Sequence, residues 1–133
     1  PSFEETKDYF QKLYLGEKEE GGLNEKETLL PSLDLLKSLS NNKNKFKIGL
    51  VTGRPRSEAL HFLRRFDIVD LFDALVCDED TSLHKPDPAP VLECLKRLGG
   101  GFEKEETIML GDTVDDMVAA TAAGVQGVGV LLP

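Results

Sequence analysis

Short apolar segments alternate with helical segments from residue 46 onward, and this alternation constrains the fold more than any other feature of the chain. Segments of strand length, with β-branched residues, are each followed by glycine or by polar, turn-forming residues. We expect strands at residues 46–52, 74–77, 107–110 and 125–131, and helices at 57–66, 88–98 and 114–123. Alternation of this kind implies a parallel, doubly wound sheet with helices on both faces, in the α/β class.

The first 45 residues follow another pattern. Helical spacing of apolar residues predicts helices at 2–15 and 32–39, separated by a charged, glycine-containing segment (16–24) that we expect to be an exposed loop. The polar run 40–45 ends the second helix. We therefore divide the chain into residues 1–30 and an α/β part, residues 31–133.

Charge and apolar content limit the partners. Twenty-four acidic against sixteen basic residues give a net charge of −8, which argues against a nucleic-acid partner. A small phosphorylated metabolite remains compatible, because a cation and a few local groups can hold it. The longest apolar run, 124–133, is about half of what a membrane helix needs, so no membrane partner is expected. Cys77 and Cys94 lie far apart and indicate buried thiols, with a cytoplasmic location as the default expectation.

The first predicted strand ends in Thr52-Gly53-Arg54. Ligands of open parallel sheets bind outside the carboxyl ends of the strands. A hydroxyl beside a glycine at such a junction can hold a phosphate oxygen together with free backbone N–H groups. The alternative is that Thr52 ends the strand and Gly53 makes a turn. Arg54 could reach a phosphate, although a solvated arginine is the favoured interpretation.

Lys85 precedes the helix predicted at 88–98 and is followed by Pro86 and Pro88. The two prolines fix the backbone near the lysine without using an N–H group. An ammonium presented in this way suits a phosphate or a nucleophilic carboxylate. The alternative is a surface lysine before a helix, and the neighbouring His84 is interpreted as an incidental loop residue.

An acidic loop, Asp112-Thr-Val-Asp115-Asp116, follows the strand predicted at 107–110. Asp112 and Asp116 fall on one side of the first helical turn, and clustered carboxylates of this kind suit Mg²⁺. We expect Asp112 to be the direct ligand and Asp116 the supporting one, whereas Asp115 points about 100° away around the helix and is less favoured. The alternative is that Asp112 caps the helix and the other two are favourable first-turn charges.

Taken in order, the segments VTGRP, KPDP and GDTVDD with its AAGV sequel resemble the haloacid dehalogenase superfamily of phosphohydrolases. The resemblance covers residues 46–131 and is greatest to the subgroup related to phosphoglycolate phosphatases, which carries a helical cap. It implies a Rossmann-like hydrolase core over residues 31–133. Residues 1–30 then resemble the last part of the cap and its return to the core.

The resemblance also implies a role for each site residue. Thr52 would bind the transferring phosphoryl group and Gly53 would give it backbone access. Lys85 would stabilise negative charge on the nucleophile and the intermediate. Asp112 would ligate Mg²⁺, and Asp116 would support the metal or Lys85. The implied reaction is magnesium-dependent hydrolysis of a phosphomonoester through an aspartyl-phosphate.

The chain departs from the family at the nucleophile. Family members begin with a central strand that ends in Asp-x-Asp, whereas the Asp78-Glu79-Asp80 of this chain lies just before Lys85 and is interpreted as a solvated acidic loop. We expect an incomplete core, with the first strand lost by truncation or supplied by another polypeptide, and a fragment that is inactive alone. The unfilled gap would permit self-association or domain swapping.

Two other functions remain open. A non-catalytic binding or regulatory module could keep the fold without the nucleophile. A 2-haloacid dehalogenase is the other, but dehalogenases of this fold do not need the magnesium cluster, so Asp112 and Asp116 count against it. A receiver-type phosphoacceptor domain is disfavoured because its lysine follows the acids, whereas Lys85 precedes Asp112.

Overall fold

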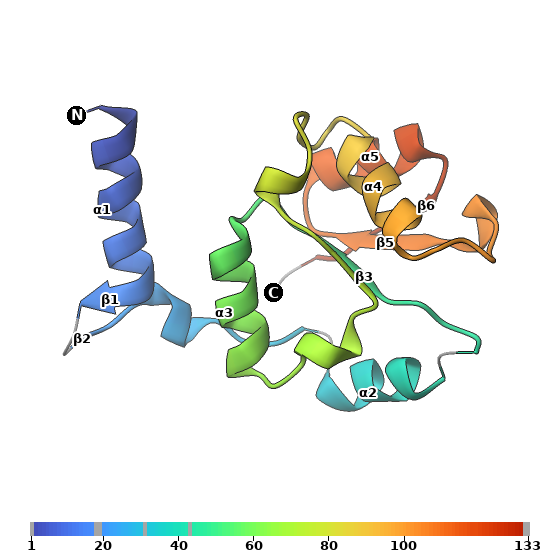
Figure 1. The fold of residues 1–133 in the computed structure, drawn as a ribbon, viewed down its shortest axis with the longest axis horizontal. Coiled ribbons are helices and arrows are strands. Elements are labelled where there is room, and N and C mark those ends of the chain that lie inside the picture. The colour runs from blue at the N-terminus through green and yellow to red at the C-terminus, as the bar shows by residue number, and fades with distance from the viewer. Residues whose placement is uncertain (1, 18–19, 31, 43, 132–133) are drawn as a thin grey trace. The chain divides into compact units, whose positions relative to one another are not determined.

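The structure is a computed structural model that describes residues 2–17, 20–30, 32–42 and 44–131. The chain forms two compact units, residues 1–33 and residues 34–133. Figure 1 shows the order of the elements along the chain. Each unit is described by itself below.

The first unit consists of a helix, a small hairpin and a helical turn. Helix α1 (Phe3–Leu15) begins at a capping box formed by Ser2 and Glu5 and ends at Gly16, whose φ of 82° suits glycine. Strands β1 (Gly16–Glu17) and β2 (Glu20–Gly21) pair antiparallel, and the 3₁₀ helix η1 (Leu23–Lys26) follows. The prediction of an exposed loop at 16–24 is therefore wrong at residues 16–17 and 20–24, which form β1, β2 and the start of η1 with Asn24 buried; residues 18–19 lie outside the described residues.

The second unit is an α/β structure, as predicted. Its helices are α2 (Leu33–Asn41), which begins at the boundary residue Leu33, α3 (Arg56–Arg65), α4 (Ala89–Arg97) and α5 (Val114–Ala123). Its strands are β3 (Gly49–Val51), β4 (Ala74–Val76), β5 (Ile108–Gly111) and β6 (Gln126–Gly129). Short 3₁₀ helices lie at η2 (Val69–Leu71), η3 (Asp78–Asp80) and η4 (Lys104–Glu106).

The strands form two separate parallel pairs. β3 pairs with β4 so that Gly49 faces Ala74, and β5 pairs with β6 so that Ile108 faces Gln126. Within the described residues neither β3 nor β5 pairs with a further strand, so each keeps an open edge. The strands are parallel as predicted, and the described residues do not pair β3 with β5, in agreement with the gap expected in the incomplete sheet.

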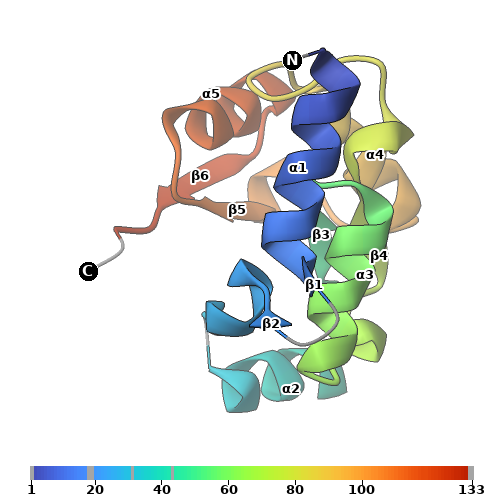
Figure 2. The same cartoon turned by 90° about the vertical axis from the view of Figure 1, so that its left-hand side faces the viewer.

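Helices α4 and α5 pack against the two strand pairs. α4 packs against β3, β4 and α5, whereas α5 packs against β5 and β6 (Figures 1 and 2). Gly49 permits the close approach of α4, because a Cβ on it would lie 2.4 Å from the Cys94 Sγ. The small face of α5 forms a core with α4 and the residue before β6: Val91, Ala119, Ala120, Ala123 and Val125.

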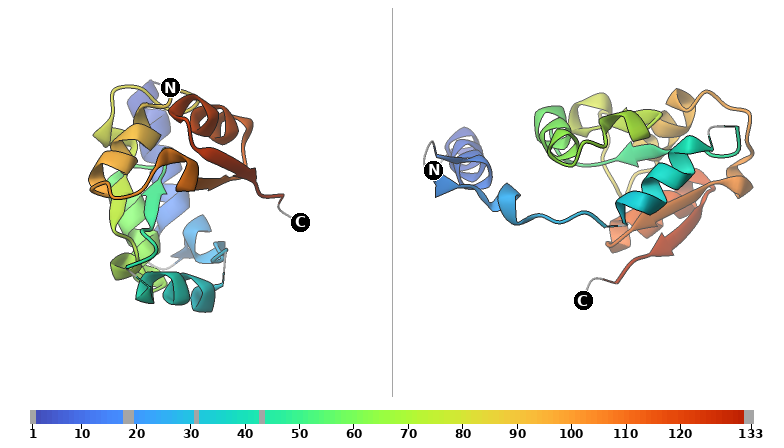
Figure 3. Two further views of the ribbon diagram at one scale, coloured as in Figure 1. Left: turned by 90° about the vertical axis from the view of Figure 1, so that its right-hand side faces the viewer. Right: turned by 90° about the horizontal axis from the view of Figure 1, so that it is seen from below.

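The β5–α5–β6 segment shows how α5 covers only one face of its strands (Figure 3). Met109 packs into the core beneath α5, whereas its neighbours Ile108 and Leu110 are 59% and 60% exposed. Val128, the partner of Leu110 on β6, is 46% exposed. The second face of this pair therefore carries apolar side chains in contact with solvent in this unit.

Two further details bear on the predictions. β3 is shorter than the predicted strand 46–52, because Phe46 and Lys47 lie outside the ladder and the N–H of Ile48 donates to the Asp73 carboxylate at 2.9 Å. Cys77 and Cys94 are both buried and both free thiols, as predicted. In the described ranges, no helix combines the length and apolar character that crossing a membrane requires.

Candidate active site

Lys85 and Asp116 form the central contact of the candidate site. The Lys85 Nζ lies 2.6 Å from the Asp116 Oδ1, and the two side chains are 22% and 7% exposed. Lys85 comes from the loop between β4 and α4, whereas Asp116 comes from the first turn of α5. The fold thus joins two residues that are 31 positions apart in the sequence. A charge-assisted hydrogen bond this short holds the ammonium in one place.

The amino terminus of α5 fixes the Asp116 carboxylate. Its Oδ2 accepts from the hydroxyl of Thr113 at 2.8 Å and from the N–H of Thr113 at 3.2 Å. The hydroxyl of Thr113 in turn accepts from the N–H of Asp116, which completes a capping box. The helix is therefore capped by Thr113, and the alternative in which Asp112 caps it is wrong.

Gly111 leaves room for this arrangement. A Cβ at Gly111 would lie 2.4 Å from the Cβ of Asp116 and 2.6 Å from its Cγ. Any other residue at this position would displace the carboxylate. Gly111 is the last residue of β5, so its importance here is the close approach of Asp116.

Two opposing effects act on the Asp116 carboxyl. Burial raises its pKa, whereas the hydrogen bonds from Lys85 and Thr113 and the charge of Lys85 lower it. The hydrogen bonds and the charge of Lys85 outweigh burial, and the pKa of Asp116 lies below its ordinary value. Asp116 is therefore ionised at neutral pH, as its pairing with Lys85 requires.

Asp112 follows β5 directly, and its carboxylate is exposed. Within the described part of the chain it makes no side-chain hydrogen bond or ion pair, and neither does Asp115. Both oxygens of Asp116 are occupied by Lys85 and Thr113. Among the three aspartates, Asp112 therefore combines a free carboxylate with a position at a strand end.

The turn after β3 carries the other predicted phosphate ligands. Thr52 is half-buried, its N–H donates to the Val76 carbonyl at 2.9 Å, and its hydroxyl accepts from the Arg54 N–H at 3.2 Å. Gly53 is exposed, and among the described residues no atom lies within 4 Å of where its Cβ would be. The backbone at Gly53 is therefore open to a ligand.

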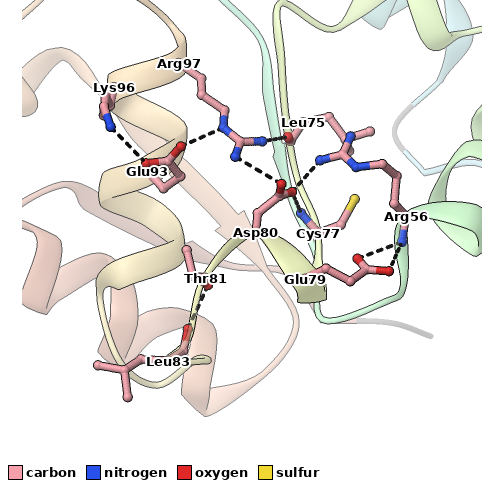
Figure 4. Close-up of polar contacts among 10 residues, drawn as sticks. All are labelled: Arg56, Leu75, Cys77, Glu79, Asp80, Thr81, Leu83, Glu93, Lys96 and Arg97. Carbon is pink, nitrogen blue, oxygen red and sulfur yellow. Dashed lines mark hydrogen bonds and ion pairs between the residues drawn. The ribbon is translucent and has the colours of Figure 1, made fainter.

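The acidic segment η3 is not the solvated loop that was expected. The Oδ2 of Asp80 accepts from Arg56 Nη2 at 2.5 Å and from the Cys77 N–H at 2.7 Å, and its Oδ1 accepts from Arg97 Nη2 at 3.0 Å (Figure 4). The side chain of Asp80 is only 15% exposed. Glu79 is exposed, but its carboxylate accepts from the Arg56 N–H at 3.0 Å.

The pKa of Asp80 is lowered by these partners. Burial acts in the opposite direction and raises it, but the hydrogen bonds from Arg97 and the Cys77 N–H and the charge of Arg56 prevail. Asp80 is therefore a paired anion at neutral pH. A carboxylate that is held by two guanidinium groups is a poor nucleophile.

The structure thus brings Lys85 and Asp116 together and places Thr52, Gly53 and Asp112 at the carboxyl ends of β3 and β5. Sequence reasoning missed Thr113, although a threonine three positions before an aspartate at a helix start is a capping-box pattern. It also missed the two arginines around Asp80. They lie 24 and 17 positions away from it, and no local pattern reveals such pairs.

Comparison with known proteins identifies the family. The model of the haloacid dehalogenase-like hydrolases matches residues 3–130. An imidazoleglycerol-phosphate dehydratase of Phytophthora nicotianae is 41% identical over 133 residues, which are 100% of this chain and 28% of that protein. A putative pyrophosphatase PpaX of Caldanaerobacter subterraneus is 42% identical over 84 residues, or 63% of this chain and 37% of that protein. A phosphoglycolate phosphatase of Yersinia pseudotuberculosis is 34% identical over 86 residues, or 65% and 36% of the two chains.

A solved structure agrees with these relatives. A putative haloacid dehalogenase-like hydrolase from Bacteroides fragilis superposes with a TM-score of 0.70 at 32% identity, covering 97% of this chain and 60% of that one. The chain spans 28% to 37% of the length of the three curated relatives. The predicted resemblance and the α/β hydrolase fold are confirmed, and the chain belongs to the haloacid dehalogenase-like hydrolase family.

Proposed function

We propose that the natural protein containing this chain is a magnesium-dependent phosphomonoester hydrolase that acts on a small phosphorylated metabolite through an aspartyl-phosphate. The observation that carries the proposal is the 2.6 Å pair of Lys85 and Asp116, mostly buried beside the end of β5. It provides a fixed positive charge where ligands of parallel sheets bind. Relatives named pyrophosphatase and phosphoglycolate phosphatase support phosphate as the recognised group.

The chain's own residues have distinct parts in this reaction. The Lys85 ammonium, held by Asp116, lies against the oxygens of the transferring phosphoryl group and offsets their charge. The hydroxyl of Thr52 donates to one of these oxygens, and the N–H groups at Gly53 approach another. The Thr52 hydroxyl accepts from Arg54 N–H, which leaves its own proton free for this donation.

The donor set suits a hard cation. Asp112 offers a carboxylate without a partner among the described residues, and Mg²⁺ in proteins is commonly held by one or two carboxylates together with substrate phosphate and water. Among the described residues no group of three or more acidic, histidine or cysteine side chains is assembled for a metal. Asp112 would therefore hold Mg²⁺ jointly with the substrate. When bound, the metal supplies Lewis-acid stabilisation of the phosphoryl oxygens.

The attacking carboxylate is assigned outside residues 1–133. The one Asp-x-Asp in the sequence is Asp78-Glu79-Asp80, and its two aspartates are engaged by His84 at 3.3 Å and by two arginines. The nucleophilic aspartate attacks phosphorus as the bond to the leaving oxygen breaks, and the leaving oxygen takes a proton from a general acid that is likewise assigned outside residues 1–133. Water then cleaves the acyl phosphate, which releases inorganic phosphate, restores the carboxylate and returns the proton.

The test is hydrolysis of p-nitrophenyl phosphate by the natural protein with and without Mg²⁺. Turnover is expected only with Mg²⁺, and Asp112→Asn should reduce it about 100-fold or more. Asp70→Asn, which changes an exposed aspartate of η2, is the matched control and should leave the rate unchanged. The 133-residue chain alone should hydrolyse the ester no faster than buffer.

Each alternative gives another result. Turnover that is unchanged in Asp112→Asn would show that the assignment of Asp112 to the active site is wrong. A natural protein that binds inorganic phosphate but never turns over would be the non-catalytic module of the same fold. Trapping of an acid-stable, hydroxylamine-sensitive phosphoenzyme would support the aspartyl-phosphate, and an active enzyme that never forms one would contradict that step.

A further inference from the structure

We propose that Asp80, held between Arg56 and Arg97, is a positioning residue of the phosphate site: it fixes the turn that carries Thr52 relative to the loop that carries Lys85. The inference rests on the proposed function and adds a residue that sequence reasoning had interpreted as solvated. Asp80 itself touches no substrate in this account. It acts through the backbone elements that its carboxylate joins.

The first link is between η3 and the turn after β3. The Arg56 side chain donates to Asp80 at 2.5 Å, while the Arg56 N–H donates to Glu79 at 3.0 Å (Figure 4). The N–H of Asp78 donates to the Arg54 carbonyl at 3.0 Å. Three contacts therefore clamp the segment Thr52–Arg56 onto η3. The position of Thr52 depends on this clamp on one side and on β3 on the other.

The second link is between η3 and α4. Arg97 donates to Asp80 at 3.0 Å and, through Nη1, to the Leu75 carbonyl of β4 at 2.7 Å. One guanidinium group therefore joins the last turn of α4 to both β4 and η3. Arginine suits this task because its planar fork makes several directed hydrogen bonds at once.

The third link leads to Lys85, which lies five positions after Asp80. The Thr81 hydroxyl donates to the Leu83 carbonyl at 2.8 Å, and His84 Nδ1 lies 3.3 Å from the Asp78 carboxylate. The loop between η3 and Lys85 is therefore folded back on η3. Lys85 and Thr52 thus share a common anchor in η3.

A carboxylate is needed at this anchor. The Asp80 side chain accepts three hydrogen bonds, two of them from guanidinium groups, and it is 15% exposed. An amide at position 80 keeps the size but loses the charge and one acceptor. Misplacement of catalytic groups by about 1 Å can cost about 100-fold in rate. Loosening the anchor should therefore reduce activity even though Asp80 lies outside the phosphate site.

The experiment compares Asp80→Asn with Glu93→Gln in the natural protein. Glu93 accepts from the same Arg97 at 2.8 Å, but it has no contact with the Thr52–Arg56 segment in the described structure. Two quantities are measured well below each variant's Tm: kcat/KM for p-nitrophenyl phosphate and the Kd of inorganic phosphate. We expect Asp80→Asn to lower kcat/KM by about 10-fold or more and to weaken phosphate binding. Glu93→Gln should stay within about 2-fold of the wild type in both.

A second variant protects the test against misfolding. Arg56→Gln removes the same contact from the α3 side, and the Asp80 carboxylate keeps Arg97 and the Cys77 N–H as partners, so it is not left unpaired. A role in stability alone would lower the Tm and leave the phosphate Kd of the folded protein unchanged. If folded Asp80→Asn and Arg56→Gln both keep wild-type kcat/KM and phosphate Kd, the positioning role is wrong.

Failure of the proposed function gives other results. A wild type that binds inorganic phosphate without hydrolysing the ester, and binds it less tightly after Asp80→Asn, would overturn the hydrolase and keep the positioning role. A wild type that neither hydrolyses the ester nor binds phosphate would overturn both. An active enzyme that is unaffected by Asp80→Asn would overturn only the inference.

Discussion

Two carboxylates of this chain, Asp80 and Asp116, are held in similar ways and serve different ends. Each follows a strand of a parallel pair, each is mostly buried, and each has both oxygens occupied. The pKa of each lies below its ordinary value. Asp80 is bound by two arginines from two different helices, whereas Asp116 is bound by Lys85 and by the cap of its own helix.

The partners account for the difference. Arg56 and Arg97 direct their fixed forks at Asp80 and join secondary-structure elements, so this cluster determines where backbones lie. The lysine ammonium at Asp116 is a compact charge with donors left for a ligand. Its neighbour Asp112 makes no side-chain hydrogen bond or ion pair with the described residues, and we propose it as the ligand of the cation. We infer that the Asp80 cluster positions the site and that the Asp116 pair belongs to it.

The largest expected effect on activity is at the Lys85–Asp116 pair. Lys85→Ala removes the charge that would lie against the phosphoryl group, and we expect kcat/KM for p-nitrophenyl phosphate to fall by about 100- to 1000-fold. Lys96→Ala, on the exposed surface of α4, is the matched control and should have no effect on the rate. Steady-state kinetics of the natural protein measures both. Equal kcat/KM values for the two variants would show that Lys85 has no role in the active site.

The next effect concerns the space beneath Asp116. A Cβ at Gly111 would overlap Asp116, so we expect Gly111→Ala to lower the free energy of unfolding by about 1–3 kcal/mol. Gly53→Ala, where no described atom lies within 4 Å of the new Cβ, should change it by less than about 0.5 kcal/mol. Urea unfolding of the natural protein compares them. Similar values would show that Gly111 has no special packing role.

A smaller effect should appear on acidification. The folded pKa of Asp80 and of Asp116 lies below the unfolded value of about 3.9, so the unfolded chain binds more protons at mildly acidic pH. The stability that these carboxylates contribute is therefore complete above about pH 5 and is lost as the pH falls through the folded pKa. The free energy of unfolding, from urea titrations at a series of pH values, should fall less on acidification in Asp80→Asn and in Asp116→Asn than in the wild type. In Asp70→Asn it should fall as it does in the wild type. A wild type whose stability is constant from pH 6 to pH 3 would contradict both pairings.

The smallest effect is expected at an exposed pair. His84 and Asp78 are 57% and 46% exposed at a separation of 3.3 Å, and surface pairs contribute about 0–1 kcal/mol. His84→Ala should therefore change the free energy of unfolding by less than about 0.5 kcal/mol in a urea titration. A loss above about 2 kcal/mol would show that the loop before Lys85 depends on this pair rather than on the Asp80 cluster.

The sequence predicted the parts of this molecule that have a local pattern. Hydrophobic period and turn residues placed the four strands of the second unit and all five helices of eight residues or more to within about three residues at either end. A strand end followed by Asp112 and Asp116 marked the acidic loop. The largest difference at a helix end is at α2, which runs to Asn41, two residues beyond its predicted end. These features are encoded within a few neighbouring residues.

The remaining features depend on residues that are distant in the sequence. Nothing near Asp80 indicates that Arg56 and Arg97 converge on it, because the two arginines come from the first residue of α3 and the last residue of α4 and meet only in the folded chain. The gap between β3 and β5 follows only from the family resemblance, through the missing first strand, because each strand by itself looks like part of a continuous sheet. Whether residues 1–30 are the remainder of a cap stays a prediction.

The most direct test of the central claim is a double-mutant cycle of Lys85→Ala and Asp116→Asn in the natural protein, read as kcat/KM for p-nitrophenyl phosphate with Mg²⁺. If Asp116 acts by holding Lys85, the double variant should be no more than about 3-fold less active than Lys85→Ala alone, because the second change removes a partner that is already lost. If the two losses multiply in the double variant, Asp116 acts independently of Lys85, and the pair at the centre of this account is not a functional unit.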